Sequence, residues 1–358
     1  MKNEVKTISF KGQKIYVGID VHLKSWTVTV LLLHTFIKTF SQNPSAKELA
    51  NYLRRNFPDG DYCSAYEAGF CGFVPHRELG SEGIQNIIVN AADIPTTDKE
   101  RKQKEDRRDS LKIAKSLRSG DLMGIHVPPI GMVEFRSLVR FRKTTVKDIG
   151  RNKSRIKSYL YFNGISIPRE LDGASKYWSA RFTKWLSTVE LTTPEGKMVL
   201  EKILGTVQHL RKDLLEVNRK LRKVAKEGVY SKFLQLLLSI PGIGLVSAVT
   251  LLSELDNITR FMNLDRLCSY VGLVPSTRSS GENDSTGRIT KRSNQHLRTV
   301  LIECAWVAVK QDPALSLRFS ELCQRMKKND AIVRIAKKLL NRIRYVMKNE
   351  TKYVYAVV

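Results

Sequence analysis

The stretch KIYVGIDVHLKSWTVTVLLL, residues 14–33, decides the fold of the first third of the chain. Two β-branched apolar runs flank a short polar interruption, and this pattern predicts two strands joined in a hairpin. Asp20 follows the run Tyr-Val-Gly-Ile at the end of the first strand. An unpaired charge is costly beside such apolar residues unless a cation neutralises it. The hairpin therefore predicts the start of a sheet and a first candidate metal ligand.

Strands and helices alternate after this hairpin. A helix is expected at 46–56, a strand followed by a glycine turn and a helix at 61–79, and a buried strand within 83–95. A charged helix over 99–120 should stop near Gly120. Glu67 lies where the strand of the 61–79 segment meets its loop. This alternation predicts an α/β layer domain over residues 12–127.

The sequence HVPPIG, residues 126–131, ends that pattern, because adjacent prolines cannot continue a helix. Residues 128–228 read mainly as long helices, and their Leu and Val spacing suits a helical hairpin or a coiled coil between subunits. A solvated helical linker is the alternative. The first of these helices is strongly basic, and its candidate nucleic-acid-binding residues are Arg136, Arg140, Arg142, Lys143, Lys147 and Arg151.

A third region, residues 229–358, opens with two apolar helices joined by Ile-Pro-Gly-Ile-Gly. This pattern predicts a helix-hairpin-helix, in which Gly242 and Gly244 allow a tight turn and present backbone N–H groups to a DNA phosphate. A plain packed turn between two helices would have the same apolar pattern. A polar segment, PSTRSSGENDSTGRITKRSN, follows at 275–294, and the rest of the region is mostly helical.

The composition favours a polyanionic partner. The chain has 358 residues, with 61 Lys and Arg against 35 Asp and Glu, a formal net charge of +26. Such an excess suits nucleic acid, because each phosphate contact releases condensed counterions. Five scattered cysteines predict reduced thiols, and no stretch reaches the roughly 18 apolar residues needed to span a bilayer. We therefore expect a protein of the cytoplasm that stays where the DNA is, without a membrane partner.

The acidic residues of the first region suggest metal-dependent phosphodiester chemistry. Two divalent cations need several carboxylates that converge from different elements. Asp20 and Glu67 lie at strand ends, and the i, i+3 spacing of Asp106 and Asp109 puts both on one helix face. The neighbouring acids Asp98, Glu100 and Glu105 are competitors for the same role.

These motifs together resemble one family. The run Val-Gly-Ile-Asp20, the Tyr66-Glu67-Ala-Gly motif, the 104–109 helix segment, the Ile-Pro-Gly-Ile-Gly hairpin and the Ser280-Gly281 segment occur in the order found in DEDD transposases of bacterial insertion sequences, also called bridge-RNA-guided recombinases. The resemblance covers nearly the whole chain. It implies an N-terminal RuvC-like, ribonuclease-H-like domain, a coiled-coil middle and a C-terminal transposase domain.

The resemblance also implies a mechanism and partners. Asp20, Glu67, Asp106 and Asp109 match the acidic residues that hold Mg²⁺, and Ser280 matches the serine that attacks a DNA phosphate and becomes covalently linked to the strand end. The acidic set and Mg²⁺ of a partner subunit complete the site in this family. A structured noncoding RNA pairs with donor and target DNA. A homodimer or homotetramer associated with the bacterial nucleoid is expected.

The residues around Ser280 leave alternatives open when read without the resemblance. Ser276, Ser279, Ser285 and Ser293 lie in the same stretch, and Ser279 is a one-position rival for the nucleophile. A serine hydroxyl needs activation, and a phosphate in transfer could be stabilised by the basic residues Arg278, Arg288, Lys291, Arg292 and Arg298.

The sequence departs from the family pattern at three positions. Glu105 stands where a small or polar residue is common, Ser110 where alanine is common, and Ser293 where glycine is common. Two histidines are candidates for proton transfer, but we interpret both differently. His22 is expected to be a surface residue of the hairpin rather than a proton shuttle, and His296 to contact phosphate rather than act as an acid or base.

Two rival functions remain from sequence. A hydrolytic nuclease of the Holliday-junction resolvase class would use the acidic set with water and would need no serine. A non-enzymatic nucleic-acid-binding protein would need neither the serine nor the acidic set.

Overall fold

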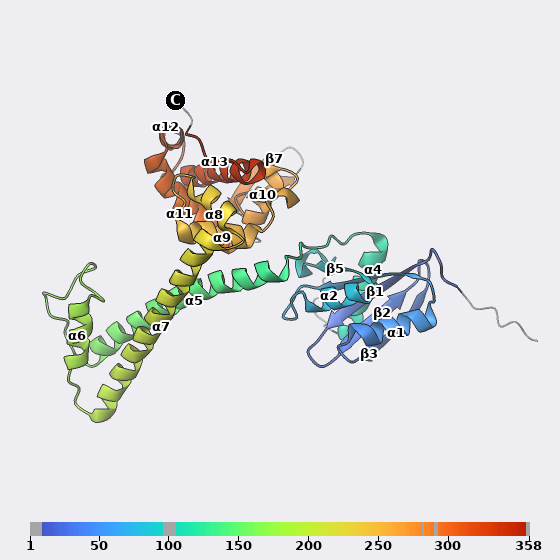
Figure 1. Ribbon diagram of the computed structural model, residues 1–358, viewed down its shortest axis with the longest axis horizontal. Helices are drawn as coiled ribbons and strands as arrows, with labels where there is room; N and C mark the ends of the chain where they lie inside the picture. The colour runs from blue at the N-terminus through green and yellow to red at the C-terminus, as the bar shows by residue number, and fades with distance from the viewer. Residues whose placement is uncertain (1–8, 96–104, 281–282, 290–292, 356–358) are drawn as a thin grey trace, which may run out of the picture. The chain divides into compact units, whose positions relative to one another are not determined.

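The computed structural model describes residues 9–95, 105–280, 283–289 and 293–355, and side chains in these ranges except those of residues 275–289. The chain forms two compact units, Met1–Val127 and Pro128–Val358 (Figure 1). Within the described residues, no helix combines the length and the apolar character needed to cross a membrane.

The first unit is a mixed five-stranded sheet in the order β3-β2-β1-β4-β5. Its strands are β1 (Lys14–Val21), β2 (Trp26–Leu31), β3 (Phe36–Gln42), β4 (Asp61–Glu67) and β5 (Gln85–Val89). β2 is antiparallel to β1 and β3, whereas β1, β4 and β5 run parallel to one another. The predicted hairpin over residues 14–33 is confirmed, and the α/β arrangement is consistent with a RuvC-like domain.

Helices cover this sheet. They are α1 (Ala46–Asn56), α2 (Val74–Ser81) and α4 (Asp106–Ser119), with a 3-10 turn η1 at Ala91–Asp93. Ser45 caps α1 by accepting a hydrogen bond from the Glu48 N–H, and the buried Leu49 and Leu53 join the core. α4 ends at Gly120 in the left-handed conformation, with φ of 79°, as the sequence predicted.

α4 lies directly on β1 because Gly18 has no side chain. A Cβ atom built on Gly18 would lie 2.1 Å from the Ser110 carbonyl oxygen and 2.4 Å from the Ala114 backbone nitrogen. The Ser110 hydroxyl is buried 2.9 Å from the Thr29 hydroxyl of β2. This close packing fixes the first turn of α4, which carries Asp106 and Asp109, against the end of β1.

Replacing Gly18 should therefore weaken the first unit. We expect Gly18→Ala to lower the free energy of unfolding by roughly 1–3 kcal/mol, the usual cost of overpacking, because backbone atoms of α4 must move. Urea denaturation followed by circular dichroism measures this. Gly80→Ala is the matched control: Gly80 lies in α2 with nothing within 4 Å of an added Cβ, so stability should stay equal or rise. Equal stability of Gly18→Ala and wild type would contradict the packing described here.

The second unit is mostly helical. Its helices are α5 (Ile130–Phe162), α6 (Ala180–Thr188), α7 (Pro194–Glu227), α8 (Ser231–Leu238), α9 (Leu245–Leu255), α10 (Leu264–Val271), α11 (Gln295–Gln311), α12 (Pro313–Cys323) and α13 (Lys328–Asn349), with the 3-10 turn η2 (Ile258–Arg260). α5 and α7 pack along each other as a long pair (Figure 1). At one end of the pair, the buried Phe182 and Leu186 of α6 contact a small core that includes Leu200 and Leu204.

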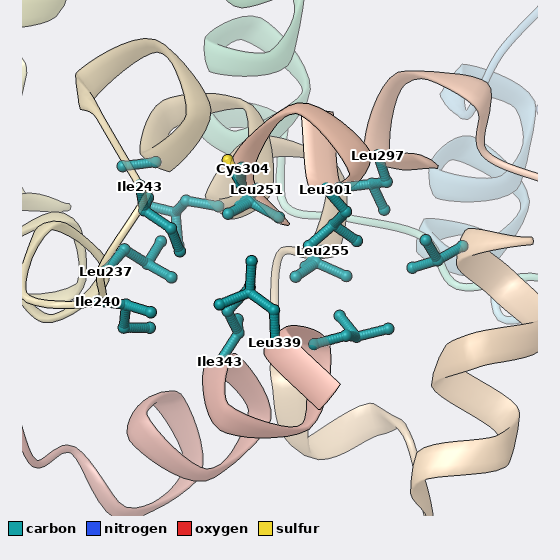
Figure 2. Close-up of a cluster of buried hydrophobic side chains, with 14 of the residues drawn as sticks. Leu237, Ile240, Ile243, Leu251, Leu255, Leu297, Leu301, Cys304, Leu339 and Ile343 are labelled. Carbon is teal, nitrogen blue, oxygen red and sulfur yellow. The ribbon is translucent and has the colours of Figure 1, made fainter. Parts of the chain in front are cut away.

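The C-terminal helices enclose a second, larger core. Figure 2 shows apolar side chains from α8, the turn after it, α9, α11 and α13 directed toward one another, among them Leu237, Leu251, Leu301 and Leu339. Residues of α5 and α7 such as Phe135 and Leu221 belong to this same core. The larger core therefore spans the regions expected at 128–228 and 229–358, and the small core around α6 lies within 128–228 alone.

The polar segment after α10 contains the only two strands of the second unit among the described residues. β6 (Pro275–Ser280) and β7 (Asn283–Ile289) form an antiparallel hairpin. The polar sequence of this segment did not predict these strands.

Candidate active site

The end of β1 and the start of α4 bring two carboxylates and an imidazole together. His22 Nε2 lies 3.1 Å from Asp20 Oδ2 and 3.5 Å from Asp106 Oδ2. One donor atom from each of the three side chains fits within 4.8 Å of the others, the spacing of ligands around one metal ion. Asp20 is the next-to-last residue of β1, close to the β1–β2 turn that carries His22, and Asp106 is the first residue of α4.

Burial and like charge both act on Asp20. Its partial burial raises the pKa of the carboxyl group above the ordinary value, and the carboxylates of Asp106 and Asp109 raise it further, while His22 opposes the shift. These carboxylates therefore repel one another where they meet. A bound cation would relieve this repulsion, and oxygen donors of this kind are the ligands that Mg²⁺ prefers.

Neither Glu67 nor Asp109 is among the three donors that lie within 4.8 Å of one another, but Asp109 is close enough to act on the charge of Asp20, and Glu67 lies on the strand beside Asp20. β1 pairs in parallel with β4 up to Ile19 opposite Tyr66, so Asp20 and Glu67 are the next residues along two adjacent strands. Glu67 is exposed and Asp109 is half-buried in the first turn of α4. Carboxyl ends of parallel strands meet at one edge of a sheet, which is where ligands bind in α/β proteins.

The other acidic residues considered as metal ligands are not part of this group. Glu105 precedes α4, and its carboxylate pairs with Arg108 at 3.1 Å. Asp98 and Glu100 lie outside the described residues.

Ser280 is the last residue of β6. The hairpin register places Ser280 opposite Asn283 and Ser279 opposite Asp284. Their side chains, and those of Arg278 and Arg288, are outside the part of the chain whose side chains are described, as are Lys291 and Arg292 entirely. Ser293 lies against Gly272: a Cβ atom on that glycine would be 2.2 Å from Ser293 Cβ.

The basic residues predicted on α5 fall into two groups. Four of them have partners inside the second unit: Arg136 donates to the Ser253 carbonyl, Arg140 pairs with Glu254, Arg142 donates to Asn218, and Lys143 Nζ lies 3.1 Å from His296 Nδ1. Lys147 is exposed, and Arg151 forms an exposed pair with Asp148. Arg140 is still 47% exposed although it pairs with Glu254, so Arg140, Lys147 and Arg151 are the residues of this set that present their charge to solvent.

The turn between α8 and α9 is built on Gly242. Its φ of 82° and an added Cβ only 2.4 Å from the Cys304 carbonyl oxygen both require glycine. The Gly242 N–H donates to Gln311 Oε1 at 2.8 Å, so this predicted phosphate donor already has a partner. Gly244 is exposed at the N-cap of α9.

Comparison with known proteins shows the family. One family model, described as a transposase and termed DEDD_Tnp_IS110, matches residues 17–163, and another, the transposase IS116/IS110/IS902 family, matches residues 234–320. Together they cover more than half of the chain. The chain belongs to the DEDD-type transposases of insertion sequences.

Similar proteins are also named as transposases. The chain is 28% identical to y4rJ of Sinorhizobium fredii, named as a transposase, over 91% of its own length and 90% of the relative's. It is 29% identical to y4qE of the same species, also named as a transposase, over 67% of this chain and 57% of that protein. The IS1533 transposase of Leptospira borgpetersenii is 24% identical, over 82% of this chain and 85% of the relative.

Sequence reasoning missed one residue of the transposase's acidic site. His22 was interpreted as a surface histidine, yet its ring contacts both Asp20 and Asp106. Its position two residues after a strand-end aspartate was the available signal. That signal is weak by itself, because turn histidines are common and only the docking of α4 brings Asp106 to the same ring.

Proposed function

We propose that this transposase cuts and rejoins DNA through a covalent phosphoserine intermediate, with divalent metal held by Asp20, Glu67, Asp106 and Asp109. The convergence of Asp20, Asp106 and His22 at one sheet edge is the observation that most supports it. Mg²⁺ is the metal we propose, because the four acids are hard oxygen donors. Metal bound there would neutralise negative charge that develops on the phosphate during strand transfer.

Ser280 would supply the nucleophile. Its Oγ would form a bond to a DNA phosphorus, one phosphorus–oxygen bond of the strand would break, and the departing strand would keep a hydroxyl that takes up the serine proton. Rejoining reverses these steps with a different strand hydroxyl. The neighbouring basic residues of the 275–292 segment would stabilise the phosphate in transfer.

DNA is the substrate, and we propose further partners for it. Lys147, Arg151 and the exposed Gly244 would contact backbone phosphates rather than bases. We also propose that a structured noncoding RNA selects donor and target sites, and that the long α5–α7 pair associates with other copies in a dimer or tetramer. The excess of +26 charge supports binding of a large amount of nucleic acid.

His22 should strengthen metal binding by orienting Asp20 and Asp106. Partners of metal ligands commonly contribute 10- to 100-fold in affinity, so His22→Gln should weaken Mn²⁺ binding by about 10- to 100-fold. Isothermal titration calorimetry with Mn²⁺ and the full chain measures this. His34→Gln, at an exposed histidine of the β2–β3 turn, is the control that should bind like wild type. Unchanged affinity in His22→Gln would remove His22 from the site.

A trapping experiment separates transfer from hydrolysis. The full chain is incubated with labelled DNA carrying the ends of its own element, with Mg²⁺ or with EDTA, and is then denatured in detergent. We expect labelled DNA to migrate with the protein only when Mg²⁺ is present. Cleaved DNA without any protein-linked product would instead support the resolvase-like hydrolytic alternative.

A further inference from the structure

A carboxylate is fully buried in α9 and has three cationic or amide donors around it. Glu254 has a side chain only 1% exposed, and its two oxygens accept hydrogen bonds from Arg140 Nε at 2.7 Å and Arg140 Nη2 at 2.8 Å. Asn294 Nδ2 donates to Glu254 Oε2 at 2.8 Å. Arg136 Nε lies 3.9 Å from the same oxygen. This group joins α5, α9 and the start of α11.

Glu254 is held in its charged form. Burial by itself would raise the pKa of this carboxyl group, but hydrogen bonds from Arg140 and Asn294, with the charges of both arginines, outweigh burial and lower the pKa. Apolar residues of the same volume often stabilise a fold as well as a buried ion pair does. The specific contribution of such a pair is to select one geometry, here the geometry at Asn294.

Asn294 follows β7, on the C-terminal side of the segment that carries Ser280. Its side-chain oxygen caps α11 by accepting from the His296 and Leu297 N–H groups at 3.0 Å and 3.2 Å. Its backbone N–H donates to the Tyr270 carbonyl at 3.0 Å. Tyr270 precedes the segment, and its hydroxyl donates to the Glu254 carbonyl at 3.2 Å.

The two ends of the segment therefore leave the core side by side. Gly272 closes α10 in the left-handed conformation, with φ of 81°, and lies in tight contact with Ser293. Tyr270, on the chain before β6, donates to the Glu254 backbone carbonyl, and Asn294, on the chain after β7, donates to the Glu254 carboxylate and to the Tyr270 carbonyl, so both positions are tied to Glu254.

We propose that Glu254 is a positioning residue for strand transfer. Its carboxylate holds Asn294, which is bonded to Tyr270 on the other side of the β6–β7 hairpin, in a fixed place relative to the basic helix α5, and this sets where the hairpin presents Ser280. This inference rests on the proposed role of Ser280. A misplacement of about 1 Å can cost on the order of 100-fold in rate, so a small shift at this anchor is enough to impair transfer.

Two substitutions test the anchor while leaving the nucleophile in place. Glu254→Gln removes the charge, and Asn294→Ser keeps a good helix cap but loses the amide that donates to Glu254. We expect both to slow formation of the protein–DNA adduct by about 10- to 100-fold at saturating DNA, with DNA affinity unchanged. In Glu254→Gln, hydrogen exchange should show lost protection at the amides of Asn294, His296 and Leu297.

The matched control is another buried ion pair of the same unit. Asp312 is 1% exposed, pairs with Arg342 at 2.7 Å and caps α12, but none of its hydrogen bonds within the described part of the chain reaches residues 270–294. Asp312→Asn should lose stability and keep the wild-type adduct rate below its unfolding temperature. The double variant Arg140→Met with Glu254→Leu should recover stability and stay slow, because Asn294 still lacks its acceptor.

The outcomes distinguish the anchor from the nucleophile. Wild-type adduct rates in Glu254→Gln and Asn294→Ser, or a double variant restored to full activity, would overturn the positioning role. A wild-type protein that forms no adduct would refute the serine mechanism instead. Even if no adduct forms, the positioning role of Glu254 can be tested by hydrogen exchange. Unchanged exchange at Asn294, His296 and Leu297 in Glu254→Gln would overturn that role.

Discussion

Ser280→Ala should abolish the covalent link between protein and DNA while leaving DNA binding intact. Loss of a nucleophile removes the atom that forms the bond, and comparable losses reduce rates on the order of 10⁴- to 10⁶-fold. The hydroxyl is a small group at a strand end beside Gly281, so its removal should not unfold the second unit. Detergent gels of labelled element-end DNA measure the adduct, and gel shifts at fixed salt measure binding.

Ser279→Ala provides the control because it changes the same chemical group one position earlier. Because successive side chains of an extended strand point to opposite faces, we expect only one of these two serines to act as the nucleophile. We expect Ser279→Ala to form the adduct at a rate close to wild type. The reverse result, with adduct lost only in Ser279→Ala, would move the nucleophile by one residue.

Asp20→Asn should eliminate both metal binding and strand cleavage. The amide has nearly the same shape as the carboxylate but no charge, so it leaves β1 in place and weakens the attraction for a divalent cation. Metal stabilisation of a phosphoryl transfer contributes several kcal/mol, so cleavage should fall on the order of 10³-fold or more. Calorimetry with Mn²⁺ and a DNA-cleavage assay in Mg²⁺ measure the two effects.

Glu105→Gln is the acidic control for this substitution. Glu105 lies one residue before Asp106 but pairs with Arg108, so it should be dispensable for the metal. We expect its cleavage rate and its Mn²⁺ affinity to match wild type. Cleavage that survives in Asp20→Asn and disappears in Glu105→Gln would show that the acidic set has been assigned in the wrong register.

Much of the first unit could be predicted because its signals are local. The alternation in residues 14–33 specified β1 and β2, and Gly120 specified the end of α4. β3 was missed because its residues are largely polar or half-exposed, as suits an edge strand, and lack a buried apolar pattern. His22 was undervalued because its contact with Asp106 depends on the close packing of α4 on Gly18.

The basic helix shows what composition alone cannot predict. Charge counts indicate a polyanionic partner but do not say which arginines face it. In the sequence, Arg140 cannot be distinguished from the other basic residues of α5. Only the packing of α5 on α9 shows that Arg140 pairs with Glu254. Glu254 itself sits in an apolar helix, Leu245–Leu255, where a single acid gave no functional signal.

Mass-spectrometric mapping of the trapped adduct tests most directly whether the acidic set and the serine act on one phosphodiester. The adduct is formed on element-end DNA with the full chain in Mg²⁺, digested, and located on its peptide. We predict a nucleotide on Ser280 in wild type, and none in EDTA or in Asp20→Asn. A nucleotide on any other residue, or a Ser280 adduct that forms equally without metal and without Asp20, would contradict this mechanism.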